Sequence, residues 1–198
     1  MYRSQRPGGS GGGRPRDPRI DDAVLAATRA LLAEVGYGRL SFELVAQRAG
    51  VTRPAIYRRW PSKVHLVHEA VFPQPGNRFV EDTGDFEADL RRQVGHMVAS
   101  YARPEARAAL SGLLTDLHGD TALRHSVIDR LEDEVRAQFA QRVATAVAAG
   151  QIDGRCDADL VLDVIVGAVF HRVVARDQSA VGVTDEIVDL VLAGLRPR

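Results

Sequence analysis

The hydrophobic positions of this chain recur at the three- and four-residue spacing of α-helices. The first stripe spans residues 20–35 and stops at Gly36, a residue suited to a helix C-terminus. Three shorter helical patterns follow within the next 40 residues or so, each after a residue that favours a helix N-terminus. They cover about 42–49, 53–60 and 63–71, preceded by Ser41, Thr52 and Ser62.

The same spacing continues after a stretch rich in turn-forming residues at 73–84. No segment alternates like a strand between hairpin signals, so the predicted fold class is all-α. We expect a flexible basic arm over 1–16, a three-helix helix-turn-helix domain over 17–72 and a larger helical domain over 73–198. The helices expected in the larger domain span about 85–102, 104–118, 121–149, 157–176 and 184–195.

Composition excludes several classes of protein. With 45% hydrophobic and 26% charged residues, the chain can bury a core and is not disordered as a whole. Its most apolar stretch, around 161–170, is interrupted by Asp163 and is too short for a membrane span, and no apolar signal region begins the chain. The single cysteine, Cys156, excludes a disulfide framework and favours the cytoplasm.

The net charge of zero conceals an asymmetry. Residues 1–72 carry 12 Arg and Lys against 6 Asp and Glu, whereas residues 73–198 carry 14 against 20. Clustered positive charge attracts phosphate. The N-terminal third is therefore expected to meet a polyanion.

The most informative motif is Ala46-x3-Gly50-Val51-Thr52-x3-Ile56, between two short predicted helices. Ala46 is small where two helices cross closely, and Gly50 can adopt the left-handed conformation that ends the first helix. Val51 and Ile56 then fill the gap between the helices. This pattern is typical of a helix-turn-helix.

The second helix of the motif is expected to begin at Thr52, whose hydroxyl would accept a hydrogen bond from the amide of Ala55. Ile56 and Trp60 lie four apart and should face the core. The outward face for a major groove would then consist of Arg53, Pro54, Tyr57 and Arg58.

A simple solvated surface is the alternative interpretation of this arginine-bearing helix. Three features favour DNA instead: the basic excess of the same third, the aromatic Tyr57 and Trp60, and Lys63 at the start of the next helix. An ammonium group beside helix N-terminal amides can hold a backbone phosphate.

The run LSFELVAQRAGVTRPAIYRRWPSKVHLVHEAVF, residues 40–72, resembles the DNA-binding domain of the TetR/AcrR family of bacterial transcriptional regulators. The resemblance implies a homodimeric, cytoplasmic, all-α regulator whose C-terminal domain forms the dimer and often holds a small-molecule pocket. Two departures are Trp60, where many relatives carry Phe, and Pro54, where a small residue is commoner. By position, the implied phosphate contacts are Thr52, Tyr57 and Lys63, those near base edges are Arg53, Ala55 and Arg58, and Ser41 and Pro54 complete the candidate DNA-binding set.

The arm adds Gly13-Arg14-Pro15-Arg16, which resembles the core of an AT-hook. Arg14 and Arg16 would then enter a narrow minor groove, where the negative potential is enhanced. The alternative is a basic tail that adds only nonspecific affinity.

The segment 157–176 is apolar on nearly every side, so it must be covered on all sides. We expect it to form a four-helix dimer interface with the last helix; a central core helix in a monomer is the alternative. The expected interface residues are Leu162, Val166, Val169, Phe170, Val173, Val188, Val191 and Leu192.

Pocket walls and core share one composition, so the candidates for an effector pocket are also candidates for core packing. They are Phe86, Met97, Tyr101, Leu113, Leu117, Phe139 and Phe170, with His96, His118 and His171 as possible polar anchors.

The sequence contains no residue pattern that supports an enzymatic function. His65, His68 and Glu69 lie close on one helix but lack the further ligand of a metal site, so neither metal nor cofactor is expected. Cys156 lies beside acidic residues, which raise a thiol pKa.

Two functions remain: a repressor that binds a palindromic operator and is released by a small molecule, or a DNA-binding regulator without an effector that acts through a protein partner or architecturally.

Overall fold

The computed structural model describes residues 18–72, 82–176 and 178–196, without the side chains of 128–131. The predicted arm with Arg14 and Arg16 lies outside the described residues. Within the described ranges every regular element is a helix and no strand occurs, so the all-α class is confirmed.

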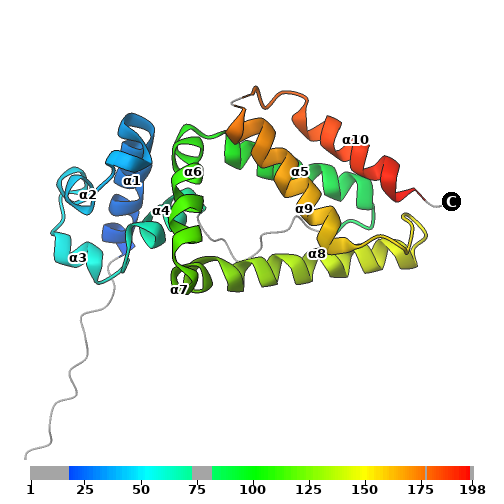
Figure 1. Cartoon of the computed structure of the whole chain (residues 1–198), viewed down its shortest axis with the longest axis horizontal. Coiled ribbons are helices and arrows are strands. Elements are labelled where there is room, and N and C mark those ends of the chain that lie inside the picture. The colour runs from blue at the N-terminus through cyan, green and yellow to red at the C-terminus, as the bar shows by residue number, and fades with distance from the viewer. Residues whose placement is uncertain (1–17, 73–81, 177, 197–198) are drawn as a thin grey trace, which may run out of the picture.

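Four helices form the N-terminal part: α1 (Pro18–Arg39), α2 (Phe42–Ala49), α3 (Arg53–Tyr57) and α4 (Lys63–Val71). They lie together at one end of the molecule (Figure 1). The backbone of α1 leaves the helical conformation at Gly36, which has φ 76° and ψ 169°, where the sequence predicts the helix to end. α3 is shorter than expected, because Arg58 and Arg59 form a turn before Trp60.

The C-terminal part begins with α5 (Phe86–Ala102) and α6 (Pro104–Gly119). Each of the two long helices predicted at 121–149 and 157–176 instead contains a segment of π-helix, in which the turn is wider than in an α-helix. Hydrophobic spacing does not separate the two helix types, because a single wide turn shifts the pattern by only one position. The remaining elements are α7 (Thr121–Arg124), η1 (His125–Asp129), α8 (Arg130–Ala148), α9 (Ala158–Val169), η2 (Phe170–Ala175) and α10 (Val183–Leu195).

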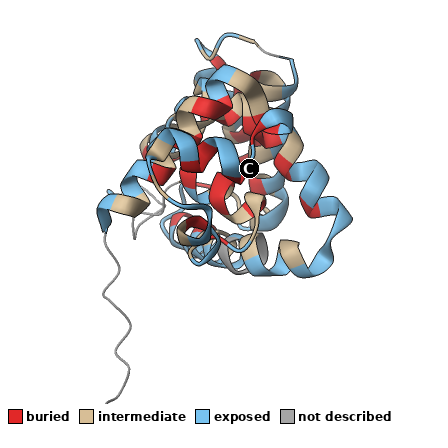
Figure 2. Ribbon diagram, turned by 90° about the vertical axis from the view of Figure 1, so that its left-hand side faces the viewer, coloured by how far each residue is buried: buried red, intermediate tan, exposed pale blue. Residues whose placement is uncertain are grey.

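Buried residues gather where the helices meet, and the outer faces of the helices are exposed (Figure 2). The buried residues form two hydrophobic clusters. The first cluster contains residues of α1, α2, α3 and α4 together with the inward face of α6, including Leu110, Leu113 and Leu117. The other joins α5, α8, α9, η2 and α10. Although α6 follows the domain boundary in sequence, it therefore shares a core with the DNA-binding helices and stands between the two parts (Figure 1).

The expected dimer interface requires a correction. Five of its eight residues are buried inside the subunit and have little or no surface to offer a partner; they are Leu162, Val169, Val173, Val188 and Val191. Val166, Phe170 and Leu192 are half-buried. Because α9 is apolar on nearly every side, the sequence does not reveal which side faces the subunit's own core.

A different apolar face of these two helices is open. Leu160 and Val164 on α9 are 61% and 47% exposed, and Leu190 on α10 is 72% exposed. Gly167 continues the α9 stripe at helical spacing and is also exposed. Within the described part of the chain, no helix is long and apolar enough to cross a membrane.

Candidate DNA-binding surface

The turn between α2 and α3 has the geometry predicted for a helix-turn-helix. Gly50 adopts the left-handed conformation, with φ 67° and ψ 30°, and its N–H is directed at the last carbonyls of α2. The Val51 N–H donates to the Ala46 carbonyl at 3.0 Å. At the other end of α2, the exposed Ser41 accepts a hydrogen bond from the Leu44 N–H at 3.3 Å.

Thr52 begins α3 in a different way from the one expected. Its hydroxyl makes no capping hydrogen bond. Instead, its backbone carbonyl accepts from the Ala55 N–H at 3.0 Å, as in any first helical turn. The Thr52 side chain is exposed, so its hydroxyl remains accessible to a DNA phosphate.

The inward side of α3 is held firmly, as predicted. Ile56 is fully buried, and Trp60 is buried while its Nε1 donates to a Glu69 carboxylate oxygen at 2.8 Å. Arg59 forms an ion pair with Asp21 of α1 and donates to the Ala55 carbonyl at 3.2 Å. These contacts fix the orientation of α3 relative to α1 and α4.

The outward side of α3 is exposed at each predicted position except Ala55, which is half-buried; the exposed residues are Thr52, Arg53, Pro54, Tyr57 and Arg58. The Tyr57 ring packs edge-on against Phe42, with centroids 4.5 Å apart. The Arg53 guanidinium lies 5.9 Å from the Tyr57 centroid. This face presents planar cationic donors, which suit guanine edges and phosphates.

Lys63, the first residue of α4, is half-buried rather than extended into solvent. Its Nζ lies 3.9 Å from the centroid of the Tyr37 ring. Burial lowers the pKa of Lys63, and the charge of Asp116 acts in the opposite direction. Ser62 caps the N-terminus of α4, and its hydroxyl accepts from the His65 N–H at 3.4 Å.

The C-terminal end of α4 is clamped by two arginines. Arg29 of α1 donates to the Ala70 carbonyl at 3.3 Å, and Arg103, in the turn between α5 and α6, donates to the Val71 carbonyl. Such contacts satisfy carbonyls that a helix end leaves unpaired. They also attach α4 to both parts of the chain.

The histidines of α4 take part in structural contacts. His65 Nδ1 lies 2.8 Å from the Ser62 hydroxyl, and burial lowers the pKa of His65. Glu69 is engaged by the Trp60 indole. No group of three or more potential metal ligands occurs among the residues that the structure describes.

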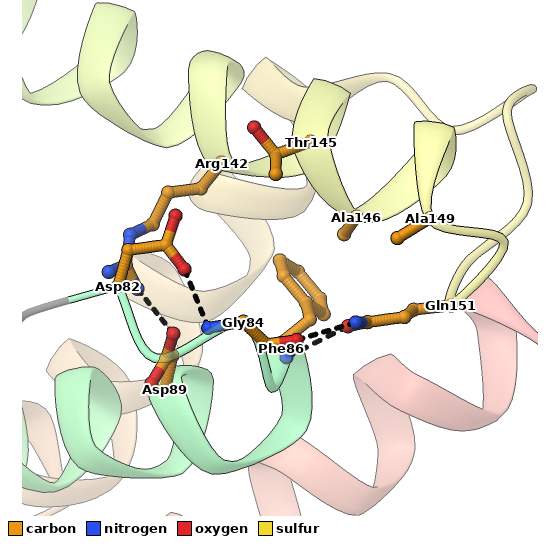
Figure 3. A pocket seen from close by; sticks show the side chains of 9 residues that line it. All are labelled: Asp82, Gly84, Phe86, Asp89, Arg142, Thr145, Ala146, Ala149 and Gln151. Atoms are coloured by element: carbon orange, nitrogen blue, oxygen red, sulfur yellow. Dashed lines mark hydrogen bonds and ion pairs between the residues drawn. The ribbon is translucent and has the colours of Figure 1, made fainter.

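A cavity of about 110 Å³ lies between the start of α5 and the end of α8, beside the candidate Phe86 (Figure 3). Gln151 closes one side, accepting from the Phe86 N–H at 2.9 Å and donating to the Gly84 carbonyl at 2.6 Å. On the other side Arg142 forms an ion pair with the buried Asp89 at 3.3 Å. Pockets for drug-sized ligands usually measure about 300–1,000 Å³. This cavity is therefore too small for such a ligand.

The structure does not gather the other pocket candidates around one space. Leu113 and Leu117 pack with the N-terminal helices, whereas Phe86 and Phe139 belong to the second cluster. Met97, Tyr101 and Phe170 are half-buried, and the proposed polar anchors His96, His118 and His171 are all exposed.

Sequence reasoning missed the contacts that join distant helices. Asp116 of α6 accepts a hydrogen bond from the Tyr37 hydroxyl at 2.5 Å, although 79 residues separate them. Arg59 and Asp21 are likewise far apart in sequence. No local signal marks such pairs, because each residue alone resembles an ordinary surface position.

Comparison with known proteins agrees with this geometry. Residues 24–70 match the family described as "Bacterial regulatory proteins, tetR family", and residues 80–191 match the "Tetracyclin repressor-like, C-terminal domain". The chain is 29% identical to the DNA-binding transcriptional repressor TetR of Mycobacteroides abscessus, over 88% of this chain and 95% of that protein. It is 28% identical to an uncharacterized HTH-type transcriptional regulator of Mycobacterium tuberculosis, over 90% and 91% of the two chains.

Solved structures agree as well. The TetR family transcription regulator SCO0332 is 31% identical, with a TM-score of 0.64 over 90% of this chain and 100% of that one. The fatty acid degradation regulator FadR from Bacillus halodurans shares the fold at 21% identity, with a TM-score of 0.70 over 93% and 100%. Family matches cover both parts of the chain, and the helix-turn-helix geometry agrees with them. This protein therefore belongs to the TetR family of DNA-binding transcriptional regulators, which are not enzymes.

Proposed function

We propose that this regulator is a cytoplasmic repressor that binds a palindromic operator as a homodimer and is released by a small molecule. The observation that carries the DNA-binding half of the proposal is the exposed face of α3 around Arg53 and Arg58, held in place by the buried Ile56 and Trp60. In a helix-turn-helix this helix enters the major groove by its N-terminal residues. The repressor role is supported by the name of the Mycobacteroides abscessus relative.

Dimerisation through α9 and α10 is supported by their open apolar face. Leu160, Val164 and Leu190 are large hydrophobic side chains left in water, which is unfavourable unless a partner covers them. The exposed Gly167 permits a second helix to approach closely. A second copy of the chain, related by two-fold symmetry, would cover the same face on both subunits.

Release by a small molecule is supported by the match of residues 80–191 to a tetracyclin repressor-like domain. The small volume of the cavity beside Phe86 favours the second candidate function, a regulator without an effector. Native mass spectrometry of the purified protein distinguishes the two. A co-purified small molecule supports the effector-controlled repressor, and a dimer of the bare chain mass supports the alternative.

Selection of binding sites from a random pool of duplex DNA, followed by footprinting, tests the DNA-binding half. The proposal expects an inverted repeat whose half-sites lie about one helical turn apart, near 34 Å, or a multiple of it. Recovery of a single asymmetric site would contradict binding as a two-fold dimer. Failure to enrich any sequence would contradict sequence-specific regulation.

A further inference from the structure

Three side chains from separate helices meet beside the DNA-binding domain: Tyr37 at the end of α1, Lys63 at the start of α4 and Asp116 on α6. The Tyr37 hydroxyl donates to Asp116 Oδ2, and the Lys63 ammonium lies on the ring of the same tyrosine. All three line an open groove of about 490 Å³ between the two parts of the chain. We name them the Tyr37 cluster.

The position of the tyrosine ring is tightly determined. Tyr37 is only 8% exposed, and Gly112 of α6 leaves the space that its ring fills, since a Cβ at Gly112 would lie 2.2 Å from Tyr37 Cδ1. Burial raises the pKa of Tyr37, and its hydrogen bond to Asp116 and the charge of that carboxylate raise it further. The phenol therefore stays protonated and continues to donate at all physiological pH values.

This fixed ring restricts Lys63. An exposed lysine samples many rotamers on its flexible stem, whereas a cation over an aromatic face is attracted by the ring quadrupole. Asp116 adds a negative charge at the hydroxyl end of the ring, and its attraction for the ammonium opposes the larger effect of burial, which lowers the pKa of Lys63. The ammonium of Lys63, the first residue of α4, is thus held over the ring of Tyr37.

We propose that Tyr37 and Asp116 are positioning residues for DNA binding: they hold the Lys63 ammonium where it meets a backbone phosphate. The inference rests on the proposed function, in which Lys63 contacts phosphate. It adds that a carboxylate of the C-terminal domain strengthens DNA binding, although its own charge repels DNA.

That opposition of signs makes the proposal testable. If Asp116 acted only as a nearby negative charge, Asp116→Asn would tighten DNA binding. If Asp116 positions Lys63 through Tyr37, Asp116→Asn weakens binding by about three- to tenfold, because a neutral amide oxygen accepts a weaker hydrogen bond from Tyr37 than a carboxylate does and no longer attracts the ammonium. Asp133, an exposed carboxylate on α8, provides the control substitution Asp133→Asn.

The experiment measures binding of the full chain to one fluorescent duplex by anisotropy at several salt concentrations. The variants are Lys63→Ala, Asp116→Asn, Tyr37→Phe and the double variant Lys63→Ala/Asp116→Asn, with thermal unfolding to verify that each is folded. Lys63→Ala is expected to lower the slope of log Kd against log salt by about one, the contribution of one phosphate contact. Asp116→Asn and Tyr37→Phe should weaken binding to a similar extent and have no further effect once Lys63 is removed.

The possible failures are distinguishable. An unchanged salt slope in Lys63→Ala removes the phosphate contact and overturns the inference with it. A second outcome is a reduced slope in Lys63→Ala together with an Asp116→Asn variant that binds DNA as well as the natural chain or more tightly, or whose loss of affinity is the same with and without Lys63. That outcome leaves the proposed function intact and overturns the positioning role alone.

Discussion

The sharpest test of the packing between the two parts of the chain is a pair of glycines, each in the interior of a helix. Gly112 lies in α6 and Gly95 in α5. At Gly112 an added Cβ would lie 2.2, 2.6 and 2.8 Å from three atoms of the Tyr37 ring, whereas at Gly95 the nearest atoms, both of Thr184, are 3.9 Å away. A Cβ essentially never approaches a nonbonded heavy atom of another residue within 3.0 Å, so the space at Gly112 is filled whereas Gly95 has room.

The two substitutions to alanine should therefore change stability in opposite directions. Alanine is favoured over glycine inside a helix by about 1 kcal/mol. Gly95→Ala retains this gain. In Gly112→Ala, overpacking costs about 1–3 kcal/mol, and displacement of the ring also weakens its hydrogen bond to Asp116. The expected net loss is about 1–2 kcal/mol, which lowers Tm by about 2–8 °C in a chain of this size.

Thermal unfolding followed by circular dichroism, at one fixed protein concentration, measures both variants against the natural chain. A Gly112→Ala variant as stable as Gly95→Ala would refute the close contact between α6 and the Tyr37 ring. The contact between the DNA-binding helices and α6 would then have to be looser than the structure has it.

Three further predictions address the dimer, a buried charge and the clamp on α4. Val164→Asp should yield monomers in sedimentation velocity, because an unpaired charge in an apolar interface is costly. The control Leu114→Asp, at an exposed leucine of α6, should remain dimeric. A dimeric Val164→Asp variant would place the interface elsewhere. Burial opposes ionisation of Asp89, but the hydrogen bonds of Thr83 and the charges of Arg142 and Arg92 outweigh it and keep the pKa of Asp89 below its ordinary 3.8. Asp89→Asn should therefore lower the free energy of unfolding by about 1–3 kcal/mol above about pH 4. This difference between the two proteins should disappear as the pH falls through the folded-state pKa of Asp89. A difference in stability that does not change with pH would show that the charge of Asp89 is not responsible for it. Arg103→Ala should increase amide hydrogen exchange in the last turn of α4, and unchanged exchange there would show that the clamp does not stabilise the helix end.

The helix-turn-helix was predictable because its information is local. The spacing of Gly50, Ile56 and Trp60 determines where a helix ends and which side of the next helix is buried. The outward face with Arg53 then follows from the helical period alone. Two details of this region were not predicted: α3 ends before Arg58, and the Thr52 hydroxyl, a single rotatable group whose alternative partner is the solvent, does not cap the helix.

The C-terminal domain was less predictable because its information is not local. In α9 almost every residue is apolar, so the pattern assigned Val169 to a dimer interface, whereas the structure buries Val169 inside the subunit and leaves Val164 exposed. The contact of Tyr37 with Asp116 depends on how α1 packs against α6, which no spacing within either helix encodes. Cavity-lining and core residues also share one composition, so the candidates for an effector pocket were divided between two clusters.

The central claim is that the exposed face of α3 reads base sequence, and the most direct measurement compares sites selected from one random DNA pool by the natural chain, by Arg53→Ala and by Arg176→Ala. Arg176 is an exposed arginine after η2, remote in sequence from the helix-turn-helix, and is the matched control. We predict that the natural chain and Arg176→Ala select the same inverted repeat. Arg53→Ala should lose preference at one symmetric pair of base positions, binding the operator about tenfold more weakly or worse while its affinity for random DNA changes much less. Identical base preferences for all three proteins would contradict the account.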